Sequence, residues 1–510
     1  MGVAAGQPSQ GKSDYLSILS GTSQNVVGIA VAAIATFAVN VLMSNALGAE
    51  GFGVVTVVTQ AAFVISFATR AGMDMAVLRD VAVEVGEGRW DRIRVPVARA
   101  TLIGAAVSTA VALIVLVAAD SVKSLFSLEG DEGRLAIQMA ALGLPFLALA
   151  NVWLSATRGL KIMRYTLYVF WAGQPILWIV LMLAGWVVAR TSWMSALAYS
   201  LSWVLAAFAA GFFWRKESRG WEARPMEPGA MNKLFRYAGP RAPAALFSQL
   251  LFWTDLFVLT RYASDVEVGV YSAALRAGQI IVLFLTSVSL MFSPFVADLH
   301  NRGETERLDK LFKTLTRWTI VATMPAFLLL LIAPEEALRI FGNRFSEGQV
   351  ALLILIAGQF INIATGSVGF VLIMVGRTGW DLVVYAGSLA INLGLAFWLC
   401  PRYGMEGAAI ANAVTFALSK WARLYLVRRF VHIQPYDREY TRLILPTAVT
   451  LGAMWAIHTF VGGNWLIDLT ATAIGGTTVY AVAYLMFGLT QAEKRGVRSL
   501  LGKMSKGAAA

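Results

Sequence analysis

The chain of 510 residues contains about fourteen apolar stretches, each long enough to cross a lipid bilayer. A transmembrane helix needs roughly 20 mostly apolar residues. These stretches constrain the fold strongly, because hydrocarbon offers no partner for backbone polar groups and a helix satisfies them internally. We therefore predict an all-α integral membrane protein. The predicted spans are 24–46, 53–73, 96–119, 134–157, 166–189, 193–213, 242–262, 268–294, 316–334, 349–373, 380–400, 405–427, 443–461 and 466–488.

Basic residues are distributed unevenly between the gaps that separate these spans. Of the 42 Lys and Arg residues, only seven lie in the even-numbered gaps, counted from the N-terminus: Lys123, Arg134, Arg190, Arg261, Arg339, Arg344 and Arg402. Two more, Arg70 and Arg276, lie inside predicted spans, and the odd-numbered gaps hold the rest when residues at their edges, such as Lys420 and Arg423, are counted with them. Because the basic side of a membrane protein is cytoplasmic, we predict an even number of spans and cytoplasmic N and C termini.

Composition excludes several classes of protein. Only 14% of the residues are charged, against about 25% in soluble domains. The net charge of +12 is confined to short loops, where it can meet anionic lipid headgroups, so we predict membrane lipids as partners and no nucleic acid. The three histidines show no metal-ligand spacing, which predicts no metal site.

A polar segment at 214–241 divides the chain. We predict an N-terminal six-helix lobe at 1–213, a cytoplasmic linker at 214–241 and a C-terminal six-helix lobe at 242–430. Two additional transmembrane helices at 431–490 and a basic cytoplasmic tail at 491–510 follow.

An internal repeat supports the two lobes. At an offset of 216 residues, Gly51–Thr56 lies over Glu267–Ser272, and Gln60 matches Arg276. A parallel repeat predicts lobes related by an axis along the membrane normal, with the substrate site where the repeats meet.

Four charged residues in or at the end of the predicted spans stand out: Arg70, Asp74, Asp255 and Arg276. A charge at the centre of a membrane helix costs about 2.5–3.5 kcal/mol on insertion scales, so such residues usually face a cavity or a partner. Arg70 and Asp74 are four residues apart and would share one helix face, and Asp255 and Arg276 would lie at similar depths on consecutive antiparallel helices. One interpretation is structural ion pairs that lock helices together. The other is a cationic cavity wall, since the planar guanidinium donates two parallel hydrogen bonds to a phosphate.

Uncharged polar residues complete the candidate cavity: Gln60, Gln249, Asn25 and Asn40. Such side chains commonly join membrane helices, and those that face a cavity could bind sugar hydroxyls. The longest segment outside the spans is about thirty residues. It carries no phosphate loop, nucleophile elbow or paired-histidine motif, so we predict that the protein is not an enzyme.

Short motifs in a fixed order add a resemblance that covers nearly the whole chain. They are Leu47–Gly53, Trp253–Leu259, Val268–Ala274, Ser293–Phe295, Phe341–Gly342, Ala357–Gln359, Met374–Arg377 and Arg402–Ala409. With these motifs in this order, the chain resembles the polysaccharide and oligosaccharide flippase family of the multidrug/oligosaccharidyl-lipid/polysaccharide exporter superfamily. Within that family it is similar to O-antigen flippases.

The resemblance implies a multi-pass flippase of the inner (cytoplasmic) membrane. Its substrate would be an undecaprenyl-pyrophosphate-linked oligosaccharide for lipopolysaccharide O-antigen, capsule or exopolysaccharide biosynthesis. The implied mechanism is alternating access of two lobes, without a cofactor, often coupled to a proton or sodium gradient. Polysaccharide polymerases and glycosyltransferases are further partners consistent with this role.

Roles for individual residues are hypotheses from their chemistry. Arg70 and Arg276 would meet the pyrophosphate, and Asp255 could pair with Arg276 until substrate or a cation displaces it. The rivals are a multidrug or cation antiporter and a lipid II flippase of the same superfamily, and a multispanning glycosyltransferase or polymerase. Two intramembrane arginines count against cationic drugs, and the short outer loops count against the glycosyltransferase.

Overall fold

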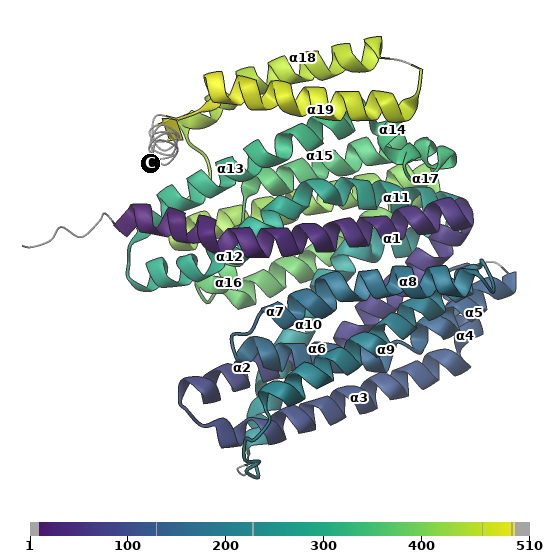
Figure 1. Ribbon diagram of the computed structural model, residues 1–510, viewed down its shortest axis with the longest axis vertical. Helices are drawn as coiled ribbons and strands as arrows, with labels where there is room; N and C mark the ends of the chain where they lie inside the picture. Colours follow the sequence, from purple (N-terminus) through teal and green to yellow (C-terminus); the bar gives the residue numbers. More distant parts are fainter. Residues whose placement is uncertain (1–9, 129, 227–228, 462, 491–492, 495–510) are drawn as a thin grey trace, which may run out of the picture.

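The computed structural model describes the backbone of residues 10–128, 130–226, 229–461, 463–490 and 493–494. The side chains of residues 10–30 and of some positions between 230 and 294 lie outside the described part. Within the described residues the chain forms helices and no strand, which confirms the predicted all-α class (Figure 1).

The predicted N-terminal lobe contains nine helices among the described residues. They are α1 (Gln10–Thr69), α2 (Met73–Gly86), α3 (Arg94–Val117), α4 (Ala119–Leu125), α5 (Gly130–Ala141), α6 (Leu144–Gly159), α7 (Arg164–Thr166, continued by a π-helical stretch Leu167–Gly173), α8 (Gln174–Trp186) and α9 (Ser192–Glu217).

The rest of the chain adds ten more helices within the same described ranges. They are α10 (Ala230–Leu259), α11 (Asp265–Gln279), α12 (Leu283–Asn301), α13 (Thr305–Ile332), α14 (Pro334–Arg339), α15 (Gln349–Thr365), α16 (Val368–Met374), α17 (Thr378–Val431), α18 (Ile444–Phe460) and α19 (Trp465–Ala483).

By length and hydropathy, the described residues contain 11 candidate membrane spans and a shorter apolar helix at Ala245–Leu259. Two of the spans, in α1 and α17, are interrupted by glycines with non-helical geometry, Gly48 (φ 71°) and Gly404 (φ 51°). Glycine adopts positive φ without steric cost, so each of these helices changes direction there and covers two predicted spans. The total of fourteen stays a prediction.

The predicted linker is shorter than expected, because α10 already begins at Ala230. The polar composition of 230–241 suggested a loop, but Leu234 and Ala238 are buried in a cluster with Met73 and Ala76 of α2. This apolar contact stabilises the early turns of α10. The predicted tail at 491–510 lies almost entirely outside the described residues.

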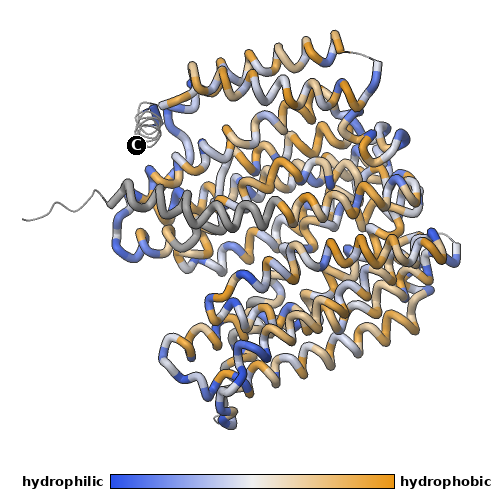
Figure 2. The backbone as a smooth tube through the Cα atoms, viewed as in Figure 1, coloured by the Kyte–Doolittle hydropathy of each residue, from blue (hydrophilic) through white to orange (hydrophobic). Residues whose placement is uncertain are grey.

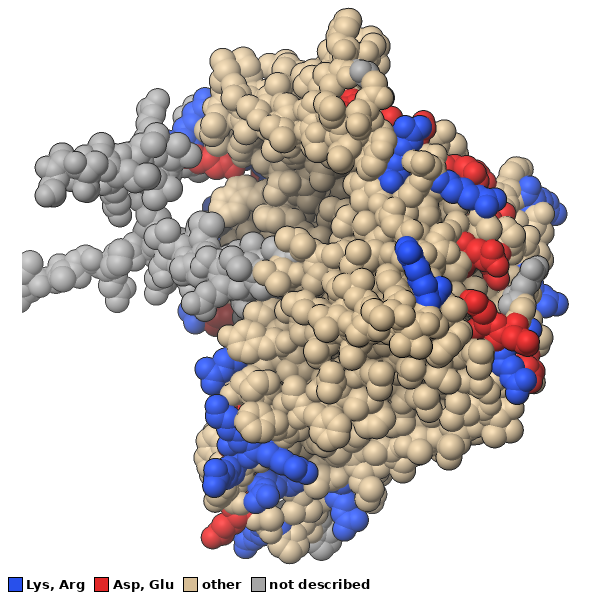
Figure 3. All heavy atoms as spheres, turned by 45° about the vertical axis from the view of Figure 1, so that its right-hand side comes forward, with Lys and Arg blue, Asp and Glu red and all other residues tan. Residues whose placement is uncertain are grey.

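The helices run roughly side by side, and both ends of the described chain lie at the same end of the bundle (Figure 1). We call this the terminal end, which the sequence predicts to be cytoplasmic, and the opposite one the far end. Hydrophilic residues gather near both ends, with hydrophobic helices between them (Figure 2). Figure 3 shows the same pattern in space, with a broad uncharged surface between charged groups. This is the distribution expected of a multi-pass membrane protein.

The first helix of each repeat reaches toward the opposite lobe. Near the N-terminus, Phe37 of α1 packs edge-on against Phe341, with ring centroids 5.3 Å apart. In the second repeat, Phe257 of α10 contacts Phe126, at 5.5 Å. The two lobes are therefore joined by α1 and α10, while α18 and α19 pack together on the side of α13 (Figure 1).

Candidate functional site

The lobes approach most closely where α1 crosses α11, at two glycines that the repeat makes equivalent. A Cβ atom on Gly269 would lie 1.9 Å from the carbonyl oxygen of Ala49, and one on Gly53 would lie 2.4 Å from that of Asp265. Ala49 and Asp265 are also separated by the repeat offset of 216 residues. Reciprocal contacts of this kind are what an approximate twofold axis generates. They support the repeat that the sequence predicted.

The same helix faces carry polar residues toward the terminal end. One turn beyond the glycines are Thr56 and Ser272, and about two turns beyond are Gln60 and Arg276, since residues at i+3 and i+7 share a face. Thr56 and Ser272 are 2% and 1% exposed, whereas Gln60 and Arg276 are half-buried. The interface is therefore tightest at the glycines and looser at the polar pair.

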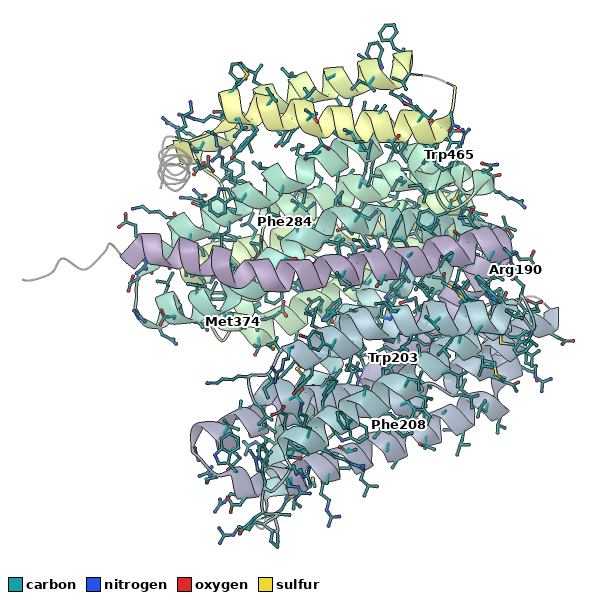
Figure 4. All side chains as sticks on the ribbon, in the orientation of Figure 1. Arg190, Trp203, Phe208, Phe284, Met374 and Trp465 are labelled. Carbon is teal, nitrogen blue, oxygen red and sulfur yellow. The ribbon has the colours of Figure 1, made fainter. Side chains whose placement is uncertain are left out.

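Arg276 is a cation within the membrane that has no ion pair among the described residues. Its guanidinium lies over the ring of Trp253 of α10, 4.8 Å from the centroid, and close enough to Tyr199 of α9 for an electrostatic interaction. Its Nε is buried without a hydrogen-bond partner. Trp203, labelled in Figure 4, packs against Tyr199 in this part of α9. Arg276 thus faces elements of both lobes and can donate hydrogen bonds to an anion.

Asp255 does not pair with Arg276, so that prediction is wrong for this conformation. Its carboxylate is fully buried and accepts hydrogen bonds from the Tyr271 hydroxyl and, at 3.1 Å, from Asn412 Nδ2. Residues two positions apart in a helix point to nearly opposite sides. Asp255 therefore faces away from Trp253, on which Arg276 lies.

Arg70 and Asp74 do pair, but across a helix break rather than along one helix as predicted. The break is formed by Ala71 (φ 48°) and Gly72 (φ 71°), between α1 and α2. Arg70 Nη1 lies 3.0 Å from Asp74 Oδ2, and Arg70 Nε donates to the Ser66 carbonyl at 2.9 Å. Both side chains are less than a tenth exposed. The contacts favour the structural interpretation for this pair.

A second arginine accompanies this pair. Arg158 of α6 interacts electrostatically with both Asp74 and Arg70. Its Nη2 donates to Ser155 Oγ at 2.6 Å, and its Nε is buried without a partner. Two guanidinium groups thus share one carboxylate, which leaves a net positive charge near the terminal end.

The structure does not bring Arg70 and Arg276 together. Gln60, the repeat equivalent of Arg276, lies ten residues before Arg70, which is roughly 15 Å along a helix at 1.5 Å per residue. The contacts of Arg70, with Ser66, Asp74 and Phe67, share no residue with those of Arg276, with Trp253 and Tyr199.

The remaining predicted polar residues have different surroundings. Gln249 is half-buried and lies one turn before Trp253 on α10, so it belongs to the face that carries Arg276. Asn40 is 3% exposed and its Nδ2 donates to the Thr36 carbonyl at 2.7 Å, within its own helix. The side chain of Asn25 lies outside the described residues.

Sequence reasoning missed a buried charge cluster in the C-terminal lobe. Arg423 Nε lies 2.9 Å from Asp381 Oδ1, both side chains are less than a tenth exposed, and the guanidinium lies 4.1 Å from the centroid of the Tyr385 ring. Lys420 interacts with both charges. The two basic residues were assigned to a loop, although each falls within the predicted span 405–427. Opposite charges in adjacent spans were the signal.

A surface cavity lies elsewhere. It has a volume of about 730 Å³ at the surface of the N-terminal lobe, and its lining includes Trp90, Asp91, Glu217, Trp221 and Glu222. These acidic and aromatic residues follow α2 and α9, so the cavity does not include Arg276.

Comparison with known families agrees with the ordered motifs. Residues 18–300 match the model of a family described as polysaccharide biosynthesis protein, and residues 240–398 match the MatE family.

Individual relatives are similar at low identity. The chain is 23% identical over 257 residues, half of its length, to a probable low-salt glycan biosynthesis flippase, Agl15, of Haloferax volcanii. It is 20% identical over 438 residues, 82% of its length, to a putative O-antigen transporter of Shigella flexneri, 99% of which is covered. The matched segment spans about half the length of the archaeal flippase, at 54%.

Solved structures share the fold. The inward closed conformation of the lipid II flippase MurJ has a TM-score of 0.68 at 14% identity, with 89% of this chain and 98% of that chain covered. An inward-facing multidrug resistance MATE family transporter of the MOP superfamily has a TM-score of 0.64 at 14% identity, with 78% and 98% covered.

Proposed function

Because the chain belongs to the polysaccharide biosynthesis protein family, we propose that it is a flippase that moves a lipid-linked oligosaccharide across the inner (cytoplasmic) membrane. The proposed substrate is an undecaprenyl-pyrophosphate-linked repeat unit for O-antigen, capsule or exopolysaccharide. The names of its relatives, a glycan biosynthesis flippase and a putative O-antigen transporter, support this class of cargo.

The observation that carries the proposal is the guanidinium of Arg276 at the interface of the lobes, which has no ion pair within the described part of the chain. A charge held in a membrane without a counter-ion is costly and marks a functional site by default. Its fork matches the oxygens of a phosphate or pyrophosphate, and its position next to both lobes lets such a ligand influence how they pack. Gln60 and Gln249, on the adjoining faces, are placed for sugar hydroxyls.

The proposed path uses the arginines in succession. The net positive charge of Arg70, Arg158 and Asp74 attracts the anionic headgroup near the terminal end. The headgroup then reaches Arg276, while the lipid tail stays in the bilayer. Alternating access follows when the glycine contact between α1 and α11 opens and the terminal side closes.

Asp255 is the proposed coupling residue. A fully buried carboxylate that is held by two neutral donors, Tyr271 and Asn412, can bind a proton or a sodium ion without moving a salt bridge. Flipping in proteoliposomes with a proton gradient or a sodium gradient alone tests this role. Loss of gradient dependence in Asp255→Asn supports it, and an unchanged dependence rejects it.

The decisive experiment is a clean gene deletion followed by measurement of surface polysaccharide and intracellular undecaprenyl-linked oligosaccharide. The flippase proposal requires loss of polymer at the surface and accumulation of the lipid-linked unit inside. Unchanged polysaccharide with altered drug tolerance would instead identify an antiporter. Loss of viability with accumulated lipid II would identify a lipid II flippase.

Complementation of the deletion then tests the site. Arg276→Ala should abolish polymer output at normal protein levels, because the anion loses both hydrogen bonds. Arg276→Lys should restore it only in part, since an ammonium group keeps the charge but not the fork. The matched control is Arg339→Ala at the far end, which removes a half-exposed salt bridge with Glu335. Full output from Arg276→Ala would remove this residue from the mechanism.

A further inference from the structure

Three potential metal ligands that are far apart in sequence meet at the far end of the bundle. Glu336 of α14, His458 of α18 and Asp468 of α19 each place a ligand atom so that all of these atoms lie within 4.8 Å of one another. The first turn of α19, marked by Trp465 in Figure 4, lies beside α14 in Figure 1. The sequence predicted no metal site because the ligands come from three separate helices.

The contact between His458 and Asp468 has an unusual geometry. His458 Nδ1 lies 2.7 Å from Asp468 Oδ2, yet Nδ1 is buried and has no hydrogen-bond partner. The oxygen is therefore close to the nitrogen but is not aligned with its N–H direction. Two ligand atoms that share one zinc ion, each about 2.0–2.2 Å from it, lie roughly 3 Å apart without hydrogen bonding each other.

No basic residue other than His458 forms an ion pair with this cluster among the residues that the structure describes. Arg339, the nearby basic residue of α14, is bound by Glu335 at 2.5 Å. No hydrogen bond or ion pair of Glu336 occurs within the part of the chain that the structure describes. Asp468 is also positioned by Thr472, whose hydroxyl donates to Oδ1 at 3.2 Å. Two carboxylates and one imidazole are thus available to a divalent ion.

We propose that Glu336, His458 and Asp468 form a zinc-class divalent metal site that joins the two C-terminal helices to the far end of the C-terminal lobe. One nitrogen and two oxygen ligands are a set that suits zinc and leaves a position for water. Because α14 follows α13 in the C-terminal lobe, the ion fixes α18 and α19 to that lobe. The proposal does not depend on the flippase assignment.

Zinc binding to the purified full-length protein tests the site directly. The protein is stripped with a chelator and titrated with ZnCl₂, and bound zinc per chain is measured by elemental analysis. We expect one zinc per chain, at least tenfold weaker binding in His458→Gln and in Glu336→Gln, and unchanged binding in Glu335→Gln. The last variant removes a neighbouring carboxylate of the same helix that points to Arg339 instead.

Two further measurements separate loss of a ligand from loss of the fold. His458 is 29% exposed and Glu336 is half-buried, so neither substitution should leave a cavity in the core. Elution of each variant as a single symmetrical peak in size-exclusion chromatography verifies that it is folded. Zinc should also slow hydrogen exchange at the start of α19 in the wild type but not in Asp468→Asn. Equal zinc binding by the wild type and the Glu336→Gln/His458→Gln double variant would overturn the proposal, as would no binding by the wild type.

Discussion

The glycine contact between α1 and α11 makes a quantitative prediction for Gly269→Ala. The added Cβ would lie 1.9 Å from the carbonyl oxygen of Ala49, whereas real Cβ contacts are essentially never shorter than 3.0 Å. The two helices must therefore separate locally by at least about 1 Å, and the contacting atom is backbone that no side-chain rotation can move. Overpacking of this kind typically costs 1–3 kcal/mol. The substitution therefore destabilises the conformations in which α1 and α11 are in contact at these glycines.

If the far end opens during transport, this cost appears as a population shift. A penalty of 1–3 kcal/mol changes the equilibrium by roughly 5- to 150-fold toward the open form. The control is Gly278→Ala on the same helix, where the new Cβ would meet side-chain atoms only at 3.8 Å. Gly53→Ala, on the other lobe, should shift the equilibrium in the same direction, because its Cβ meets the Asp265 carbonyl at 2.4 Å.

Cysteine labelling measures the opening. The only native cysteine, Cys400, is buried and is replaced by serine. Ser272→Cys then places a thiol one turn beyond Gly269, at a position that is 1% exposed. We expect an impermeant maleimide to label it from the far side at least about fivefold faster in Gly269→Ala than in Gly278→Ala. Equal rates in the two variants, in folded protein, would refute the view that the glycines close the far end.

Two further predictions concern charged contacts near the terminal end. Arg423→Leu should lower stability by about 3–5 kcal/mol, measured by unfolding in detergent, because it removes the guanidinium that pairs with the buried Asp381 carboxylate; the double variant with Asp381→Leu should recover much of that loss. Burial alone would raise the pKa of Glu493, but hydrogen bonds from a backbone N–H, Trp318 and Arg317 outweigh it and hold the pKa below its ordinary value of 4.5. The stabilisation is therefore complete above pH 4.5 and is lost as the pH falls through the lower folded-state pKa, so the difference in Tm between wild type and Glu493→Gln should shrink in acid.

Sequence patterns predicted the spans and the repeat because both depend on local composition. Apolar runs must be helical in a bilayer whatever surrounds them. The equivalence of Gly53 and Gly269 could be seen in the aligned repeats, because a close backbone approach allows only glycine and so keeps the same residue at both positions. The structure adds that these two glycines meet one another, which the alignment could not specify.

Charge partners were harder to predict, since they depend on direction as well as depth. Asp255 and Arg276 lie at similar depths, but Asp255 faces the opposite side of α10 from Trp253. Arg70 and Asp74 stay paired although the chain breaks between them at Ala71 and Gly72. The spacing of four residues predicted the right partner for Arg70, but the two residues lie on either side of a helix break and not on one helix as that spacing assumed.

The arginines within the bundle differ in whether a carboxylate of the same lobe pairs with them. Arg70 and Arg423 are each paired with a carboxylate of their own lobe, so their charges move with that lobe as a unit. Arg276 has an aromatic ring instead, and a cation–π contact offsets only about 0.5–2 kcal/mol. That is less than the cost of about 2.5–3.5 kcal/mol for a charge in the membrane. The uncompensated remainder favours any anion that binds Arg276. A carboxylate partner at this position would remove that advantage, so an arginine without an ion pair among the described residues suits the proposed binding of an anionic substrate between the lobes.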